Sequence, residues 1–70
     1  MEKYIRFSKW HLTEDCIVVN DTDLYILGQW NEDKWINCYQ IDHFGKIIKT
    51  KIEIIPVMVQ NMIIGVEIYA

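Results

Sequence analysis

Few side chains in this chain have the types and spacing that chemistry at a site requires. Cys16, Cys38, His11 and His43 could ligate zinc, but none of them forms the short ligand pairs typical of zinc sites. The serine, Ser8, has no base beside it in the local sequence, and no glycine-rich loop precedes a helix start. The acidic clusters lack the ligand spacing of a dedicated calcium loop. We therefore predict no catalytic residues, no metal site and no cofactor, and we expect that the chain is not an enzyme.

His43 and the two cysteines have structural explanations that require no function. The stretch from Asp42 to Gly45 predicts a turn in which Gly45 takes a positive φ and Asp42 binds backbone amides, so His43 needs no functional role. In the strand register given below, Cys16 and Cys38 lie on one face two strands apart. Two inter-strand spacings amount to roughly 9–10 Å, which exceeds the reach of a disulfide. We expect buried free thiols and a reducing compartment.

The amount of apolar side chain is large for so short a chain. Of 70 residues, 51% are hydrophobic, including three Trp, four Tyr and two Phe. The length fits one domain, residues 1–70, whose interior is too small to hold all of these side chains. Contiguous exposed apolar groups usually mark an interface. We predict a protein partner and self-association as a homodimer, and the residues expected to bind are Trp10, Trp30, Trp35, Tyr25 and Phe44.

Charge and hydropathy argue against generic binding to nucleic acid and against contact with a membrane. Seven basic and ten acidic residues give a net charge of −3, which disfavours generic attraction to phosphate backbones or anionic membranes. The first residues lack the apolar run of a signal peptide, and the longest apolar run, Ile54 to Val59, is far shorter than the roughly 20 residues that span a bilayer. We expect a cytoplasmic protein with no membrane contact. The frequent Ile and rare Ala are typical of AT-rich coding sequences, such as those of low-GC bacteria and their phages.

The elements that must position these residues are predicted to be strands. β-branched and aromatic residues dominate, no helical periodicity persists, and polar clusters recur about every ten residues. The connections are too short for parallel crossovers, so consecutive strands should form antiparallel hairpins. The predicted fold is an all-β antiparallel meander of five or six strands that forms a curled sheet or a small barrel, and it resembles SH3-like barrels in architecture alone. The expected strands are residues 3–11, 16–20, 24–30, 34–42, 46–55 and 62–69.

Hairpin registers predict which residues share a face. A turn at Asp21-Thr22 sets Val19 opposite Leu24 and Ile17 opposite Ile26. A four-residue loop, 31–34, sets Trp30 opposite Trp35, and the next turn sets Tyr39 opposite Ile48 and Trp35 opposite Ile52. The resulting core is Val19, Leu24, Ile26, Tyr39, Ile41, Ile48, Ile52 and Ile54, and the opposite face carries Val18, Tyr25, Leu27, Ile36 and Cys38.

The last fifteen residues leave two alternatives. Their β-branched content favours a hairpin that turns at Gln60-Asn61, and the other reading is a short helical turn after Pro56. A bare apolar edge strand is rare in natural proteins, so residues 63–69 should pair with the first strand or with another subunit.

Three functions follow from these patterns. The leading prediction is a non-catalytic protein-binding module, an inhibitor or adaptor that acts on a macromolecular partner, with a phage protein directed against a host or defence enzyme as one context. The second is a small barrel that binds single-stranded nucleic acid, because two strands hold most of the positive charge and would form one stripe if they were adjacent. The third is a structural subunit of a larger assembly. The residues of the predicted basic stripe are Lys3, Arg6, Lys9, Lys46, Lys49 and Lys51.

Overall fold

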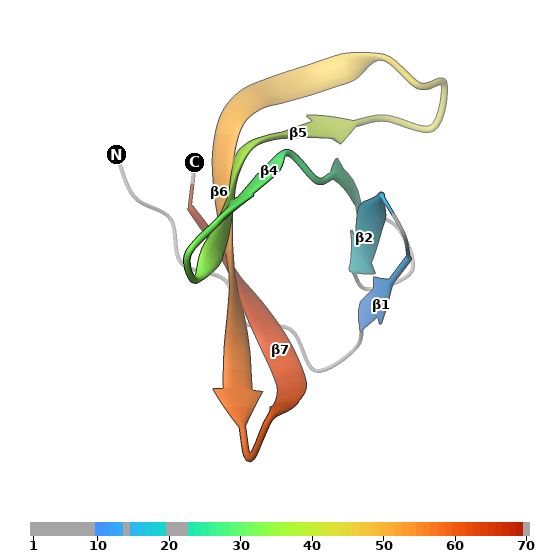
Figure 1. Cartoon of the computed structure of the whole chain (residues 1–70). Helices are drawn as coiled ribbons and strands as arrows, with labels where there is room; N and C mark the ends of the chain where they lie inside the picture. The colour runs from blue at the N-terminus through green and yellow to red at the C-terminus, as the bar shows by residue number, and fades with distance from the viewer. Residues whose placement is uncertain (1–9, 14, 20–22, 70) are drawn as a thin grey trace.

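The computed structural model describes residues 10–13, 15–19 and 23–69, and these form one antiparallel sheet that curls into a half-barrel (Figure 1). The sheet order is β1-β2-β3-β5-β6-β7, and β4 pairs with β5. The predicted all-β antiparallel fold is confirmed. The strands are β1 (Trp10–Leu12), β2 (Cys16–Val19), β3 (Asp23–Ile26), β4 (Gln29–Asn31), β5 (Lys34–Ile41), β6 (Ile47–Val59) and β7 (Met62–Tyr69).

Two turns form where the local sequence predicts them. The Asp42 carboxylate accepts hydrogen bonds from the backbone N–H groups of Phe44 and Lys46, each at 2.9 Å, and Gly45 has a φ of 82°. A two-residue turn at Gln60-Asn61, with φ angles of 50° and 67°, joins β6 to β7. Positive φ at both central residues is the geometry of a tight hairpin turn. The tail is therefore a hairpin, and the alternative helical turn after Pro56 does not form.

The predicted strand 24–30 is divided at Gly28 into β3 and β4. A Cβ atom at Gly28 would lie 1.9 Å from the carbonyl oxygen of Ile36, so only glycine allows the two backbones to approach this closely. Both halves still pair with β5, through Ile26↔Tyr39 and Gln29↔Ile36. The backbone N–H of Gly28 donates to the sulfur of Cys38 at 3.3 Å. A buried thiol thus satisfies a donor at the bend.

The β4–β5 hairpin has the predicted register with a tighter loop. Trp30 is opposite Trp35, as expected, but Asn31 pairs with Lys34, so the turn has two residues instead of four. Glu32, the first turn residue, has a φ of 60°. The hairpin therefore projects its two tryptophans from neighbouring positions and carries an acidic turn at its end.

Two other predicted registers are wrong. In the β2–β3 pair, Val19 is opposite Asp23 and Ile17 is opposite Tyr25, one residue away from the expected alignment. In the β5–β6 pair, Trp35 is opposite Ile54, Cys38 is opposite Ile52 and Gln40 is opposite Lys49, with irregularities between them. Asn37 and Lys51 have φ angles of 57° and 58°, which interrupts the alternation of side chains along both strands.

These register changes put a different face of the central strands inside the curl. Of the predicted core, Val19, Ile52 and Ile54 are buried, four residues are partly buried (Leu24, Ile26, Tyr39 and Ile41), and Ile48 is 55% exposed. Tyr25 and Cys38, predicted on the outer face, are buried because an odd shift of register exchanges the two faces. The observed core is Ile17, Val19, Tyr25, Cys38, Ile52, Ile54, Val66 and Ile68.

Strand β6 changes its partner along its length. Its first part pairs with β5 as far as Ile54, and its second part pairs with β7 from Glu53 to Val59. Since β5 begins at Lys34, the described residues supply β6 beyond Ile55 with a strand neighbour on the β7 side only. Pro56, which lacks an N–H, is tolerated there because one side of the strand is unpaired.

The predicted pairing of the first strand with the last lies mostly outside the described residues. Among those described, β1 pairs with β2, and β1 and β7 stand at opposite ends of the strand order. No helix in the described part of the chain is long and apolar enough to cross a membrane.

Candidate binding groove

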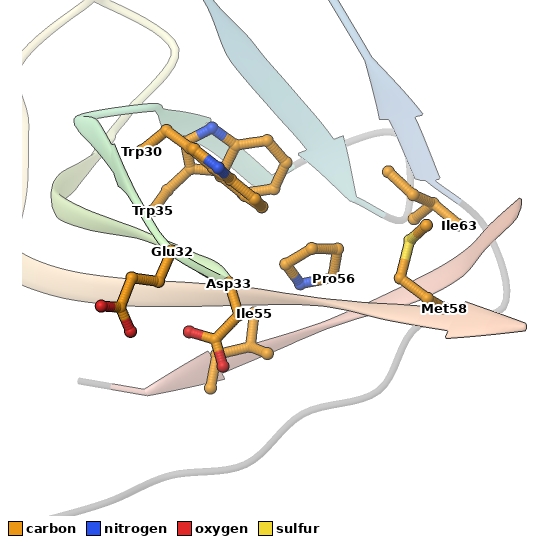
Figure 2. Close-up of a pocket in the computed structure, with 8 residues that line it drawn as sticks. All are labelled: Trp30, Glu32, Asp33, Trp35, Ile55, Pro56, Met58 and Ile63. Carbon is orange, nitrogen blue, oxygen red and sulfur yellow. The ribbon is translucent and has the colours of Figure 1, made fainter. Parts of the chain in front are cut away.

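A groove of about 550 Å³ lies where β6 leaves β5 and continues alongside β7. Figure 2 shows the two tryptophans over one side of it and Pro56 beneath them, with Met58 and Ile63 at one end. Binding sites are typically concave and mostly apolar with a few polar groups. The lining residues are Trp30, Glu32, Asp33, Trp35, Ile55, Pro56, Met58 and Ile63.

The tryptophans form a rigid wall of the groove. Their ring centroids are 4.8 Å apart and the ring planes are inclined at 66°, an edge-to-face contact. Trp35 also packs against the buried core, whereas Trp30 is 54% exposed. Trp35 therefore anchors the pair, and Trp30 offers a ring face to an incoming group.

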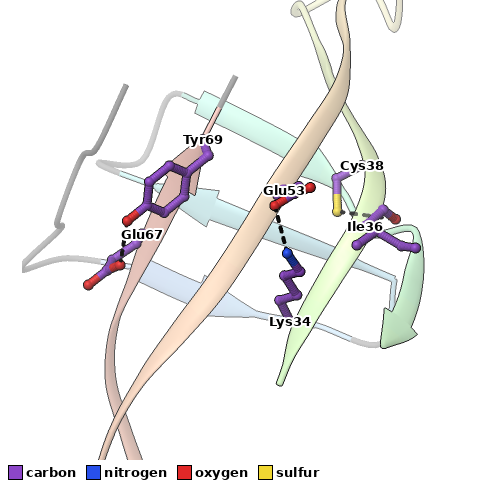
Figure 3. Close-up of polar contacts among 6 residues, drawn as sticks. All are labelled: Lys34, Ile36, Cys38, Glu53, Glu67 and Tyr69. Atoms are coloured by element: carbon purple, nitrogen blue, oxygen red, sulfur yellow. Dashed lines mark hydrogen bonds and ion pairs between the residues drawn. The ribbon is translucent and has the colours of Figure 1, made fainter. Parts of the chain in front are cut away.

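Two carboxylates stand at the other end of the groove. Glu32 and Asp33 occupy the exposed β4–β5 turn, and Figure 2 shows their side chains beside Ile55 and away from Met58 and Ile63. The neighbouring Lys34 directs its ammonium to Glu53, at 3.0 Å, and not into a hydrogen bond with either turn carboxylate (Figure 3). The hydrogen bond to Glu53 and that carboxylate's charge raise the pKa of Lys34, and the charge of Asp33 adds to the rise. The groove consequently has an acidic end and an apolar end.

The apolar end continues onto the β6–β7 hairpin. Met58 lines the groove and is 51% exposed, and every residue from Met58 to Met62 is exposed as well. Contiguous exposed apolar side chains are expected at interaction surfaces. The exposed apolar residues of this hairpin are Met58, Val59, Met62 and Ile64.

The structure brings together only part of the predicted binding set. Trp30 and Trp35 meet in the groove, but Tyr25 is buried in the core and is not available to a partner. Phe44 is 94% exposed, yet it lies in the β5–β6 turn, at the far end of β6 from the groove. Trp10 begins β1, and its side chain lies outside the described part of the structure.

The predicted basic stripe stays a prediction, because it required residues 3–11 and 46–55 to be adjacent and most of the first segment lies outside the described residues. In the described part, β1 pairs with β2, and β6 pairs with β5 up to Ile54 and with β7 from Glu53. Lys46, Lys49 and Lys51 are exposed along the β5–β6 turn and the start of β6. Lys3, Arg6 and Lys9 lie outside the described residues.

The two cysteines are free thiols, as predicted. Cys38 is fully buried, and its sulfur is also 3.9 Å from the carbonyl oxygen of Ile36 (Figure 3). Burial raises the pKa of the Cys38 thiol, although the hydrogen bond from Gly28 acts in the opposite direction. Cys16 is only partly buried, with its sulfur 2.9 Å from the hydroxyl of Thr13.

Other titratable groups have partners that explain their positions within the fold. The Tyr69 hydroxyl donates to Glu67 at 3.0 Å (Figure 3), and Asp42 holds the turn described above. Burial, reinforced by the nearby charge of Asp23, raises the pKa of Tyr25. In the described ranges, no cluster of three or more His, Cys, Asp or Glu side chains could hold a metal ion.

Sequence reasoning identified the tryptophan pair but missed the rest of the groove. Ile55, Pro56, Met58 and Ile63 join the tryptophans only because β6 exchanges β5 for β7. The one available signal was Pro56 within an apolar run, which marks a strand segment that is not paired on both sides.

Comparison with protein-family models, with curated proteins and with solved structures gives no match to this chain. Its function must therefore be inferred from its own residues.

Proposed function

We propose that this chain is a non-catalytic protein-binding module whose partner docks in the groove between the β4–β5 and β6–β7 hairpins. The observation that carries the proposal is the half-exposed Trp30 held edge-to-face on Trp35 at the side of an apolar groove. Tryptophan is enriched among the residues that dominate binding energy at interfaces. A module without a reaction of its own acts by occupying or bridging its partner, so the role is that of an inhibitor or an adaptor.

The shape of the groove favours a short segment of a partner protein. Its floor runs from Ile55 to Met58 along β6, a length of about 10 Å at roughly 3.3 Å per residue. That length accommodates about three residues of an extended chain. The exposed hairpin beyond Met58 enlarges the contact toward the area that a stable complex requires.

The acidic end of the groove favours protein over nucleic acid. Aromatic platforms that stack bases lie in positively charged grooves, whereas the carboxylates of Glu32 and Asp33 repel a phosphate backbone. The complementary partner segment carries an apolar or aromatic side chain together with a basic one.

A matched pair of substitutions tests the proposal. Met58→Glu places a charge at the groove, and Phe44→Glu places the same charge on an exposed apolar residue at the other end of β6. With the chain immobilised as bait and bound proteins identified by mass spectrometry, we expect Met58→Glu to lose specific partners and Phe44→Glu to retain them.

Circular dichroism and urea unfolding of both variants provide the folding control. Partners that bind the folded Met58→Glu variant as well as they bind the unaltered chain would exclude the groove as the docking site.

A further inference from the structure

A second exposed surface among the described residues combines apolar side chains with positive charges. We name it the basic arm, and it is the β5–β6 turn with the first residues of β6. Its apolar members are Phe44, Ile47 and Ile48, which are all more than half exposed. Its cationic members, Lys46, Lys49 and Lys51, are exposed as well.

The basic arm carries the chemistry that the groove lacks. Phe44 offers an exposed ring for the tryptophan wall, and Lys46, two residues later, offers an ammonium for the carboxylates of Glu32 and Asp33. Aromatic pairs gain energy beyond simple burial, and unlike charges steer association and fix orientation. Asp42, the acidic residue of the turn, is engaged by two backbone N–H groups of that turn.

The tip of the basic arm lies far from the groove of its own chain. Phe44 and Lys46 precede β6, and the groove begins at Ile55 in the second half of that strand. At about 3.3 Å per residue, Lys46 and Ile55 are roughly 30 Å apart along the strand. Figure 1 likewise shows the β5–β6 turn and the β6–β7 hairpin at opposite ends of the molecule. The two surfaces of one chain therefore do not meet, whereas the surfaces of two copies can.

We propose that two copies of this chain form a twofold dimer in which each inserts its basic arm into the groove of the other. One Phe side chain accounts for only about 150–250 Å², and a stable interface needs roughly 1,200–2,000 Å². The exchange therefore has to occur at both ends of the dimer and has to include Ile47 and Ile48 of each arm as well as the exposed β6–β7 hairpin. Surfaces at opposite ends of one strand allow this when the copies lie antiparallel.

This inference rests on the proposed function, since it assigns an occupant to the same groove. In the dimer, the basic arm and a partner segment compete for the tryptophan wall. Binding of a partner would therefore dissociate the dimer, and without a partner the protein would keep its apolar groove covered.

Reversal of charge tests the exchange. One variant carries Glu32→Lys and Asp33→Lys in the groove, and the other carries Lys46→Glu and Lys49→Glu in the basic arm. Each variant alone sets like charges against each other at both contacts of the dimer. An equimolar mixture restores opposite charges at both contacts, because one contact is reversed and the other is native.

Analytical ultracentrifugation is the measurement. We expect the unaltered chain to sediment at twice its mass of 8.4 kDa, each variant to self-associate at least about tenfold more weakly, and the mixture to recover the dimer. Asp15→Lys, a reversal at an exposed residue outside both surfaces, should leave the dimer intact.

Three results would overturn the inference. They are a monomeric unaltered chain at high concentration, variants that dimerise like the unaltered chain, and a mixture of folded variants that fails to associate. If the dimer is absent while Met58→Glu still abolishes partner binding, only the inference fails and the proposed function stands.

Discussion

Replacement of Gly28 by alanine should be the most damaging small change in this chain. The added Cβ would lie 1.9 Å from the carbonyl oxygen of Ile36 and 2.7 Å from two backbone atoms of Asn37. These neighbours belong to the backbone of β5 and cannot rotate away as a side chain would. To restore a contact of 3.0 Å, β3 and β4 must move at least about 1.1 Å from β5 (3.0 − 1.9).

The cost follows from the hydrogen bonds that this movement breaks. Gly28 donates to Cys38 at 3.3 Å, and the flanking pairs Ile26↔Tyr39 and Gln29↔Ile36 depend on the same strand spacing. Two or three disturbed hydrogen bonds at partly buried and exposed groups, each with a net contribution of about 0.5–1.5 kcal/mol, together predict a loss of about 2–4 kcal/mol. A domain of this size has only about 3–10 kcal/mol in total.

Urea unfolding monitored by tryptophan fluorescence measures this loss, and Gly45→Ala is the control. At Gly45 a Cβ would meet nothing within 4 Å, so only the positive φ of 82° is costly, by about 1 kcal/mol. We expect Gly28→Ala to lower the unfolding free energy at least about twofold more than Gly45→Ala. Equal losses in the two variants would refute the close approach of β3–β4 to β5.

The remaining predictions concern the core, the irregular strand and alkaline pH. Ile54→Ala should cost about 2–5 kcal/mol and Ile48→Ala less than about 0.5 kcal/mol in chemical denaturation, and the reverse order would contradict the observed core. Lys51→Gly should stabilise the fold by about 0.5–1 kcal/mol, because glycine relieves the strain of a φ of 58°, and a clear loss of stability would contradict that backbone conformation. Because burial raises the pKa values of Cys38 and Tyr25, both groups ionise more readily when unfolded. The unfolding free energy should therefore be full below about pH 8.5 and fall as the pH rises through about 10, and Cys38→Ala should reduce the first part of that fall.

Local features of the fold could be predicted because their causes are local. The Asp42–Gly45 turn needs only a carboxylate, two nearby amides and a glycine, and the Gln60-Asn61 turn needs residues that tolerate positive φ. The same holds for the Trp30–Trp35 pair, since a tight hairpin brings together the residues on either side of its turn.

The inner face of the sheet could not be predicted in the same way. Side chains alternate along a strand, so a one-residue change of register between β2 and β3 exchanges the faces of Tyr25 and Leu24. The irregularities at Asn37 and Lys51 change the alternation of side chains a second time, between β5 and β6. Asparagine tolerates a positive φ but adopts it mostly in turns, and lysine rarely adopts it, so the packing of distant strands selects this conformation inside β5 and β6.

The amino-acid sequence by itself determined the antiparallel all-β class, the turns at Asp42–Gly45 and Gln60-Asn61 and the excess of apolar side chains, because composition and short-range turn geometry are sufficient for these. Tertiary structure alone decided the groove. Its apolar floor exists because β6 leaves β5 for β7 at Ile54, and Lys34 reaches across to Glu53 on β6 while Glu32 and Asp33 stay in the exposed turn. Both choices depend on residues that are far apart in the chain and meet only when the sheet curls.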